Sequence, residues 1–347
     1  MAYTTINNGS LFMNPKIYTG NGGTQTITDV NFEPDLIVTK GRDLGESPWW
    51  TDKVVGLTKY RYSDGGAADS TYTTAVTGTN SDGYVLGNQN GFNNNTNTFV
   101  SWNWKANGAG SANTDGSINS TVSVNATSGF SIVKWSGSAG NATIGHGLGA
   151  VPKMIIIKNL SDAYYWVVYH QATGNTAYTR LNTTDASSSS LNMFQNYTPT
   201  DDVFYVSSQG YVNGGGGNQM IAYCFADVQG FSKMGSYVGN GSADGTFVYT
   251  GFKPAFVMAK RSNSASSADW NIRDNKRSPI NVASQVLQAN LSSVEGTASG
   301  TLIDIYSNGF KPRSSGSGVN AGSSLYIYMA FAEAPLVGTN NIPANAR

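Results

Sequence analysis

Charged side chains are scarce in this chain of 347 residues. Asp, Glu, Lys and Arg make up 12% of it, about half the usual share in a globular protein. The 21 basic and 21 acidic residues cancel. A nucleic-acid-binding surface needs a basic stripe, and attraction to anionic lipid needs a polybasic segment. The composition therefore gives no reason to expect nucleic acid or a membrane surface as the partner.

Cysteine and long apolar runs are lacking as well. Cys224 is the single cysteine, so no disulfide can form within the chain. Its place in the apolar run 220–225 predicts a buried, unreactive thiol. No apolar run approaches the roughly 18 residues of a membrane span, and the N-terminus lacks the pattern of a signal peptide. We therefore expect a protein without membrane insertion, made and kept in the cytoplasm unless it leaves in an assembly or by lysis.

Glycine and aromatic residues are plentiful instead. The chain contains 41 Gly, 19 Tyr, 14 Phe and 7 Trp. Gly-rich turns between aromatic and β-branched runs favour sheet over helix. The length is sufficient for two or three domains, each with its own core.

A set of landmarks recurs three times in the same order. Each copy opens with an aromatic residue and a Gly-rich turn, and a proline follows 16 or 17 residues later with a lysine six positions after it. A tryptophan, a Ser-x-Gly-aromatic turn and an aromatic closing strand complete each copy. The prolines are Pro34, Pro152 and Pro254, the lysines are Lys40, Lys158 and Lys260, and the tryptophans are Trp50, Trp166 and Trp270. Such periodicity predicts repeated structural units.

The spacing of short strands and turns predicts an all-β protein of three tandem antiparallel β-sandwich or jelly-roll-like repeats. We place them at 15–108, 109–229 (a linker and the second repeat) and 230–335, with an N-terminal arm at 1–14 and a C-terminal tail at 336–347. The Gly- and Asn-rich junction 106–116 predicts a flexible linker. Two segments, 53–60 and 279–288, are open to a short helix as well as a strand.

The three shared lysines end strands of the buried type. A lysine stem can lie on apolar surface while its ammonium stays in water. We therefore expect Lys40, Lys158 and Lys260 to place their charges in solvent, with no catalytic role. Trp166 and Trp270 are expected in the core.

Side chains suited to catalysis or metal binding are few. His146 lies in a Gly-rich turn and His170 ends an apolar run, and we interpret both as structural. No zinc-type cluster and no HExxH or GxSxG motif is present, although carboxylate pairs for glycoside hydrolysis have no fixed spacing in sequence. Asp82, Asp115 and Asp244 lie in turns that hold other oxygen-bearing side chains, but none matches an EF-hand, so calcium binding stays open. We expect a non-enzyme without catalytic residues, cofactors or metal ions.

Loop aromatics are the candidates for ligand binding. Aromatic faces cover the C–H surfaces of sugars, and neighbouring amides bond their hydroxyl groups, although aromatics also fill sandwich cores. The candidate platform residues are Trp49, Tyr164, Tyr178, Tyr197 and Tyr211. They lie mainly in or near the loops 44–50 and 178–197, and a third variable loop covers 261–270.

Four phrases resemble a family of uncharacterised, β-rich, tail-fibre-like structural proteins of marine tailed bacteriophages, which are built from three repeats. The phrases are Tyr18-Thr-Gly-Asn-Gly-Gly-Thr-Gln-Thr-Ile27, Ser101-Trp-Asn-Trp-Lys-Ala-Asn-Gly108, Gly145-His-Gly-Leu-Gly-Ala-Val-Pro152 and Gly251-Phe-Lys-Pro254. The resemblance covers about 1–335 and implies a virion protein. It supplies no catalytic residues.

Three functions compete on this basis. The first is a tail-associated fibre or spike that contacts the host surface and binds a host glycan there. The second is a capsid decoration or other accessory virion protein, and the third, less favoured, is a polysaccharide depolymerase. Other virion proteins are the expected partners, and a homo-oligomer, with a trimer as the best guess, is the expected state. The sequence has no coiled-coil or collagen-like stalk, which slightly weakens the fibre interpretation.

Overall fold

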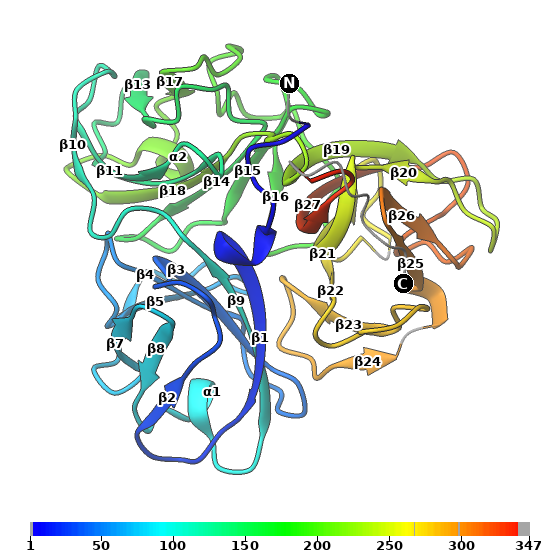
Figure 1. The fold of residues 1–347 in the computed structure, drawn as a ribbon. Helices are drawn as coiled ribbons and strands as arrows, with labels where there is room; N and C mark the ends of the chain where they lie inside the picture. The colour runs from blue at the N-terminus through cyan, green and yellow to red at the C-terminus, as the bar shows by residue number, and fades with distance from the viewer. Residues whose placement is uncertain (1–2, 267, 298, 339–347) are drawn as a thin grey trace.

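The computed structural model describes residues 3–266, 268–297 and 299–338. The chain is nearly all β and its named strands pair antiparallel, so the expected fold class is confirmed. Three groups of strands form three lobes (Figure 1), which we call unit 1 (13–104), unit 2 (111–225) and unit 3 (232–335). No helix in the described ranges has the length and apolar character needed to cross a membrane.

The elements follow one another as short strands separated by turns. Those of unit 1 and the turn before it are η1 (Gly9–Leu11), β1 (Met13–Thr19), β2 (Gln25–Ile27), β3 (Leu36–Gly41), β4 (Trp49–Asp52), β5 (Lys59–Tyr62), β6 (Ser70–Thr71), β7 (Val76–Asn80), β8 (Gly83–Leu86), α1 (Asn90–Asn93) and β9 (Thr98–Trp104). Those of unit 2 are β10 (Ser111–Asn113), β11 (Ser120–Asn125), β12 (Phe130–Ser136), β13 (Ala142–Gly145), β14 (Met154–Asn159), β15 (Val167–His170), β16 (Thr179–Arg180), β17 (Val203–Val206), α2 (Gly210–Asn213) and β18 (Gln219–Phe225). Those of unit 3 are β19 (Ser232–Val238), β20 (Val248–Tyr249), β21 (Phe252–Arg261), β22 (Asn271–Asp274), β23 (Gln285–Gln288), β24 (Gly296–Thr297), η2 (Ser299–Thr301), β25 (Ile303–Tyr306), β26 (Gly309–Pro312) and β27 (Leu325–Pro335).

The large sheets of the units share one strand order. Unit 1 has β1-β9-β3-β4-β5-β6, unit 3 has β19-β27-β21-β22-β23-β24, and unit 2 has β12-β18-β14-β15-β16 with β11 and β10 added beside β12. Each unit also has a small sheet, formed by β2-β8-β7, β13-β17 or β20-β26-β25. The shared order agrees with the expected repeat, and superposition of the three units remains a prediction.

Strand register corrects the alignment of one landmark. Trp50 pairs with Val38, two positions before Lys40, whereas Val168 and Ile272 pair with the residues two positions before Lys158 and Lys260. Trp50 is therefore equivalent to Val168 and Ile272, and not to Trp166 or Trp270. Unit 1 has Pro48 at the position of those two tryptophans, so the tryptophan spacing seen in the sequence arose by coincidence.

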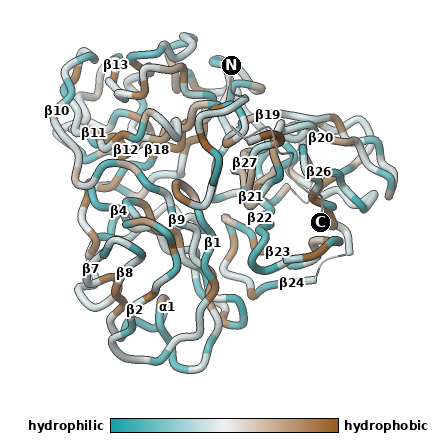
Figure 2. The backbone as a smooth tube through the Cα atoms, in the orientation of Figure 1, coloured by the Kyte–Doolittle hydropathy of each residue, from teal (hydrophilic) through white to brown (hydrophobic). Residues whose placement is uncertain are grey.

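The large sheets meet at the centre of the molecule. One continuous cluster of buried apolar side chains draws members from all three units, and hydrophobic residues lie along the interior strands while polar residues dominate the outer loops (Figure 2). A narrow central cavity of about 20 Å³ is lined by Val38, Ile156 and Met258, one from each unit at the same register position, together with other apolar residues. The units therefore share a core and form one body.

The junction between units 1 and 2 is fixed to the body. The backbone amides of Ala106 and Gly108 donate to the Asp35 carboxylate at 2.6 and 3.0 Å, and β10 pairs with β11. The expected flexible linker at 106–116 is therefore wrong. Its composition is that of a linker, but a buried carboxylate from unit 1 holds its backbone.

Both segments left open between helix and strand lack an α-helix. Residues 53–58 form turns that lead into β5, and the second half of 279–288 forms β23, which pairs with β22. Ala283 bridges to Ile303 just before this strand. Pairing with neighbouring strands satisfies the backbone groups here, and Val and Ile suit a strand.

The segment expected as an N-terminal arm packs on unit 3. The Tyr3 hydroxyl donates to the Gly251 carbonyl at 2.8 Å, Ile6 is buried in the shared core, and the rings of Phe12 and Phe231 lie 5.8 Å apart. Met13 already belongs to β1. The segment thus links the start of unit 1 to unit 3. Most of the expected tail, 339–347, lies outside the described residues.

Candidate functional site

The three shared lysines lie at the boundaries between units. Each is fully buried, and each donates to a backbone carbonyl of a neighbouring unit. Lys40 reaches Ser292 at 2.9 Å, Lys158 reaches Gly66 at 3.1 Å and Lys260 reaches Thr183 at 3.2 Å. The expectation that their charges lie in solvent is therefore wrong. Carbonyl oxygens gathered at each boundary replace water around the ammonium groups.

These contacts form a closed cycle. Unit 1 donates to unit 3, unit 2 to unit 1, and unit 3 to unit 2. Backbone hydrogen bonds cross the same three boundaries: Glu295 N to Arg42 O at 2.6 Å, Asp69 N to Leu160 O at 2.9 Å and Ser187 N to Ser262 O at 2.7 Å. We call this arrangement the ring of units. Every unit contacts both of the others, so the ring has no free end.

Replacing Lys158 by methionine should lower the free energy of unfolding by about 2 kcal/mol. The methionine keeps the apolar stem but leaves the carbonyls of Gly66, Asn159 and Asp162 without this donor, and an unsatisfied buried acceptor costs about 1–3 kcal/mol. Burial lowers the pKa of Lys158 to about 8, so the lost desolvation cost offsets part of the effect. Urea unfolding measures the difference, with Lys16→Met as the control because Lys16 makes a surface ion pair. An equal effect of the two variants would contradict this role.

A second position repeats across the boundaries with different side chains. Asp52, His170 and Asp274 occupy the same register position, opposite Leu36, Met154 and Phe256. Each contacts a group from a neighbouring unit. The Tyr223 hydroxyl donates to Asp52 at 2.9 Å, the Trp102 indole donates to Asp274 at 3.0 Å, and the His170 Nε2 lies 3.2 Å from the Tyr328 carbonyl.

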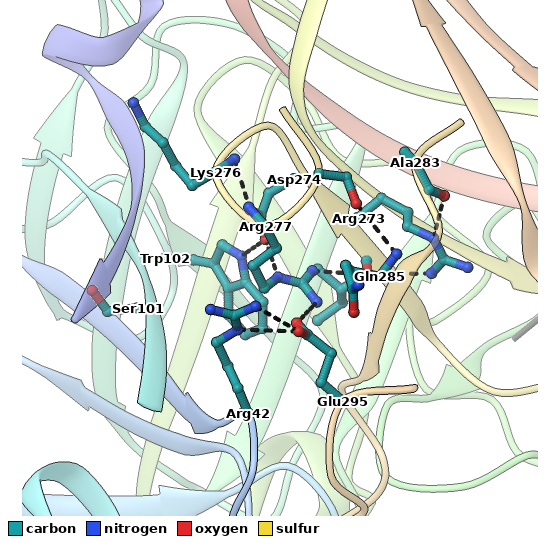
Figure 3. Close-up of polar contacts among 12 residues, drawn as sticks. Arg42, Ser101, Trp102, Arg273, Asp274, Lys276, Arg277, Ala283, Gln285 and Glu295 are labelled. Atoms are coloured by element: carbon teal, nitrogen blue, oxygen red, sulfur yellow. Dashed lines mark hydrogen bonds and ion pairs between the residues drawn. The ribbon is translucent and has the colours of Figure 1, made fainter. Parts of the chain in front are cut away.

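Both aspartates at this position are paired with arginine. Arg61 binds Asp52 and, at 3.0 Å, Asp69. At the other boundary Arg277 binds Asp274 at 2.5 Å and Glu295 at 3.0 Å, and Glu295 in turn binds Arg42 at 2.7 Å. Figure 3 shows this second network, with Trp102 of unit 1 directed at Asp274 of unit 3. Buried carboxylates require such partners. The boundaries are crossed by the ion pair of Glu295 with Arg42 and by the hydrogen bond that Arg61 donates to the Tyr223 hydroxyl of unit 2.

His170 occupies the register position of Asp52 and Asp274, and its imidazole is neutral. The backbone N–H of Ala172 donates to Nδ1 at 3.1 Å, so Nε2 carries the hydrogen and donates to the Tyr328 carbonyl. Burial lowers the pKa of His170 to about 4. His146 has the same arrangement, with Leu148 N on Nδ1 and Thr200 O near Nε2. Both histidines are therefore structural, as expected.

Acidification should weaken the boundary between units 2 and 3. The folded-state pKa of His170, about 4, lies below the value near 6.5 in an unfolded chain. The stabilisation is therefore complete above about pH 6.5 and is lost as the pH falls toward 4, which amounts to about 2 kcal/mol between pH 6.5 and 5. The free energy of unfolding of the wild type and of His170→Gln, measured at both pH values, isolates this contribution. An unchanged slope in the variant would refute it.

Cys224 behaves as the sequence predicts for a core residue. It is fully buried, and burial raises the pKa of its thiol. Around it in unit 2 lie the apolar side chains of the core. No group of three or more His, Cys, Asp or Glu suited to a metal ion occurs in the part of the chain that the structure describes.

The five candidate platform aromatics separate into different environments. Trp49 and Tyr178 are buried, so their assignment to a binding surface is wrong. Trp49 packs against Tyr60, Tyr62, Tyr72 and Phe92 in the core of unit 1. Tyr197 is 57% exposed and lies beside Tyr205, away from the pair formed by Tyr164 and Tyr211. That pair is half-buried, with ring centroids 4.7 Å apart.

Tyr165 joins Tyr164 and Tyr211, and sequence reasoning missed it. It is 40% exposed, and its ring is parallel to that of Tyr211 within 3° at a centroid separation of 6.1 Å. The Arg180 guanidinium lies 4.5 Å from the centroid of the Tyr165 ring. We call Tyr164, Tyr165, Tyr211 and Arg180 the tyrosine cluster. The available signal was the run of three aromatics at 164–166, since one of them, Trp166, already fills the core.

The loop that carries Tyr164 and Tyr165 is fixed at both ends. Lys158 donates to the Asp162 carbonyl at 3.4 Å while also binding unit 1. The Trp166 backbone donates to the Asn182 side chain at 3.1 Å, and its indole donates to the Tyr62 carbonyl of unit 1 at 2.9 Å. The boundary between units 1 and 2 therefore holds the exposed rings in place before any ligand arrives.

A family model described as "Domain of unknown function (DUF7483)" matches residues 8–335. The chain belongs to this family. The match runs from just before η1 to the end of β27, so all three units of this DUF7483 chain and the contacts that close its ring fall within it. No curated protein matches the chain. The family description assigns no activity.

Proposed function

We propose that this DUF7483 chain is a non-enzymatic structural component of a tailed-phage virion, associated with the tail and in contact with the host surface. The sequence phrases at 18–27, 101–108, 145–152 and 251–254 support the virion assignment through their resemblance to tail-fibre-like proteins. The closed, shared-core body supports a structural role. Other virion proteins are its partners.

The observation that carries this proposal is that the side chains most suited to catalysis are buried. His146, His170, Cys224 and the three shared lysines are all fully buried. A general base or nucleophile must reach the atom on which it acts. The histidines and lysines instead bond backbone groups of turns and unit boundaries. His170 and the three lysines thus stabilise the ring of units, while His146 and Cys224 lie inside unit 2.

The carboxylate networks support the same conclusion. Asp52 and Asp274 are fully buried and bonded to arginine and to a neighbouring unit. Glycoside hydrolysis needs two carboxyl groups that flank a bound sugar, and these two aspartates lie in different boundaries of the ring. A role in joining the units explains the burial of both aspartates.

The proposal is tested by incubating the purified protein with intact host cells and with host surface polysaccharide, and by locating it on the virion with an antibody. We expect saturable cell binding without release of oligosaccharide, and labelling of the phage tail by an antibody against the protein. Release of oligosaccharide would contradict the non-enzymatic assignment. Labelling of the capsid together with absence of cell binding would replace the tail assignment by capsid decoration. An intact virion without the protein would refute the virion assignment.

A further inference from the structure

We propose that the tyrosine cluster of unit 2 is a binding site for neutral glycans. The inference deepens the proposed function, since it names the ligand class through which the protein contacts a host surface. The rings of Tyr165 and Tyr211 are parallel within 3°, and the Tyr165 ring is 40% exposed, so aromatic surface is open to a ligand here. An aromatic face carries partial negative charge and attracts the weakly positive C–H groups of a pyranose ring. Flat rings thus recognise a sugar without needing its charge.

The exposure of this cluster is specific to unit 2. The loops that follow Lys40, Lys158 and Lys260 occupy the same place in the three units. In unit 1 the same register places Glu46 and Ser47 at the positions of Tyr164 and Tyr165. In unit 3 the residues 262–269 are Ser, Asn, Ala and Asp, with no aromatic side chain. The fold therefore does not require rings at this place, and the tyrosines of unit 2 need another explanation.

Two carboxylates near the cluster can bond sugar hydroxyls. The Asp162 carboxylate lies in the same loop, is exposed and accepts from the Asn218 amide. Asp185 is half exposed and binds Arg180 at 2.7 Å. Each carboxylate keeps lone pairs that can accept from hydroxyl groups.

The local charge favours a neutral ligand. Arg180 is the cation that contacts the rings, and it is already bound to Asp185 and placed over Tyr165. Lys158 lies beneath the loop with its ammonium buried among carbonyls. The exposed carboxylate of Asp162 would repel an acidic sugar. The cluster therefore selects neutral hexoses over uronic or sialic acids.

Binding of defined oligosaccharides to the full-length protein tests the inference. The probes are neutral gluco-, galacto- and manno-oligosaccharides, with oligogalacturonate of matched length as the acidic comparison, measured by calorimetry. We expect saturable binding of at least one neutral probe and a loss of roughly tenfold or more in affinity for Tyr165→Ala. Tyr165→Phe should bind like the wild type, because it keeps the ring face. Tyr197→Ala is the matched control, since Tyr197 is an exposed tyrosine outside the cluster.

The outcomes separate this inference from the proposed function. Absence of binding to every neutral probe, preference for oligogalacturonate, or equal binding by Tyr165→Ala would overturn the glycan site. Cell binding that survives in Tyr165→Ala would leave the attachment role in place while removing the cluster from it. If the protein bound neutral glycans but were absent from the virion, the glycan site would stand and the virion assignment would be refuted. Thermal unfolding of each variant confirms that a lost signal reflects the site, since Tyr165 is partly exposed and outside the core.

Discussion

Replacing Arg61 by methionine should lower the free energy of unfolding by about 3–5 kcal/mol, the usual cost of breaking a buried ion pair. Arg61 is fully buried between Asp52 and Asp69, and Asp52 also accepts the Tyr223 hydroxyl from unit 2. The variant leaves a buried carboxylate without its cation at the boundary of two units. Chemical denaturation monitored by tryptophan fluorescence measures the loss.

Two further variants sharpen this experiment. Arg61→Met combined with Asp52→Asn removes both charges and should recover part of the stability, so the cycle yields a coupling energy between the two residues. Arg313→Met is the surface control, because Arg313 is partly exposed and pairs with Asp244 and Asp304. Exposed pairs contribute about 0–1 kcal/mol. A loss below about 1 kcal/mol for Arg61→Met would show that the network does not stabilise the fold.

Replacing Trp166 or Trp270 by alanine should also cost about 3–5 kcal/mol, the usual range for truncating a core aromatic residue. Both side chains are fully buried. Their indoles donate across unit boundaries, Trp166 to the Tyr62 carbonyl and Trp270 to the Arg180 carbonyl, each at 2.9 Å. The equivalence of the two contacts predicts similar losses for the two variants.

Phenylalanine variants separate the contribution of the indole hydrogen bond from that of apolar packing. Trp166→Phe and Trp270→Phe keep most of the apolar volume but remove the donor, so a smaller loss of about 1–3 kcal/mol is expected from the unsatisfied carbonyl and reduced packing. Tyr197→Ala provides the exposed comparison, with an effect within about 0.5 kcal/mol. If the alanine variants lost less than about 1 kcal/mol, these tryptophans would not belong to the core in solution.

Local patterns in the sequence were sufficient for the fold class and for several buried elements. The apolar run around Cys224 and the strands after Pro34 and Pro152 were recognised because short continuous apolar runs are typical of fully buried strands. The His146 turn followed from its glycines in the same way. Each of these inferences needed only residues close together in the chain.

The errors about the lysines and the junction share one cause, which is that contacts between residues far apart in the chain are not visible locally. Lys40 lies 252 residues from the carbonyl of Ser292 that it binds. Considered alone, a lysine at a strand end is best placed in water, and only the facing unit makes burial favourable. The glycine-rich junction was misinterpreted for the same reason. The Asp35 carboxylate that accepts a hydrogen bond from the Ala106 amide lies 71 residues away in the chain.

The position of Asp52, His170 and Asp274 shows why a repeat alignment alone was insufficient. Different side chains occupy one register position, and their partners are a tyrosine hydroxyl, a backbone carbonyl and an indole from three different strands. The Tyr165 ring was missed because exposure depends on which neighbours cover a loop. Neither the partner of a side chain in another unit nor the exposure of a loop residue produces a periodic pattern in the sequence.

The covalent joining of three units into one chain has a consequence for how many ligands a particle can hold. Three identical subunits would display every surface feature in triplicate, and any substitution would alter all three copies at once. In a single polypeptide, one third can change while the other two keep the scaffold intact, and the parallel Tyr165–Tyr211 pair belongs to unit 2. Each molecule would then be monovalent. Firm attachment to a cell would depend on the number of chains displayed side by side, since tethered copies gain avidity by rebinding.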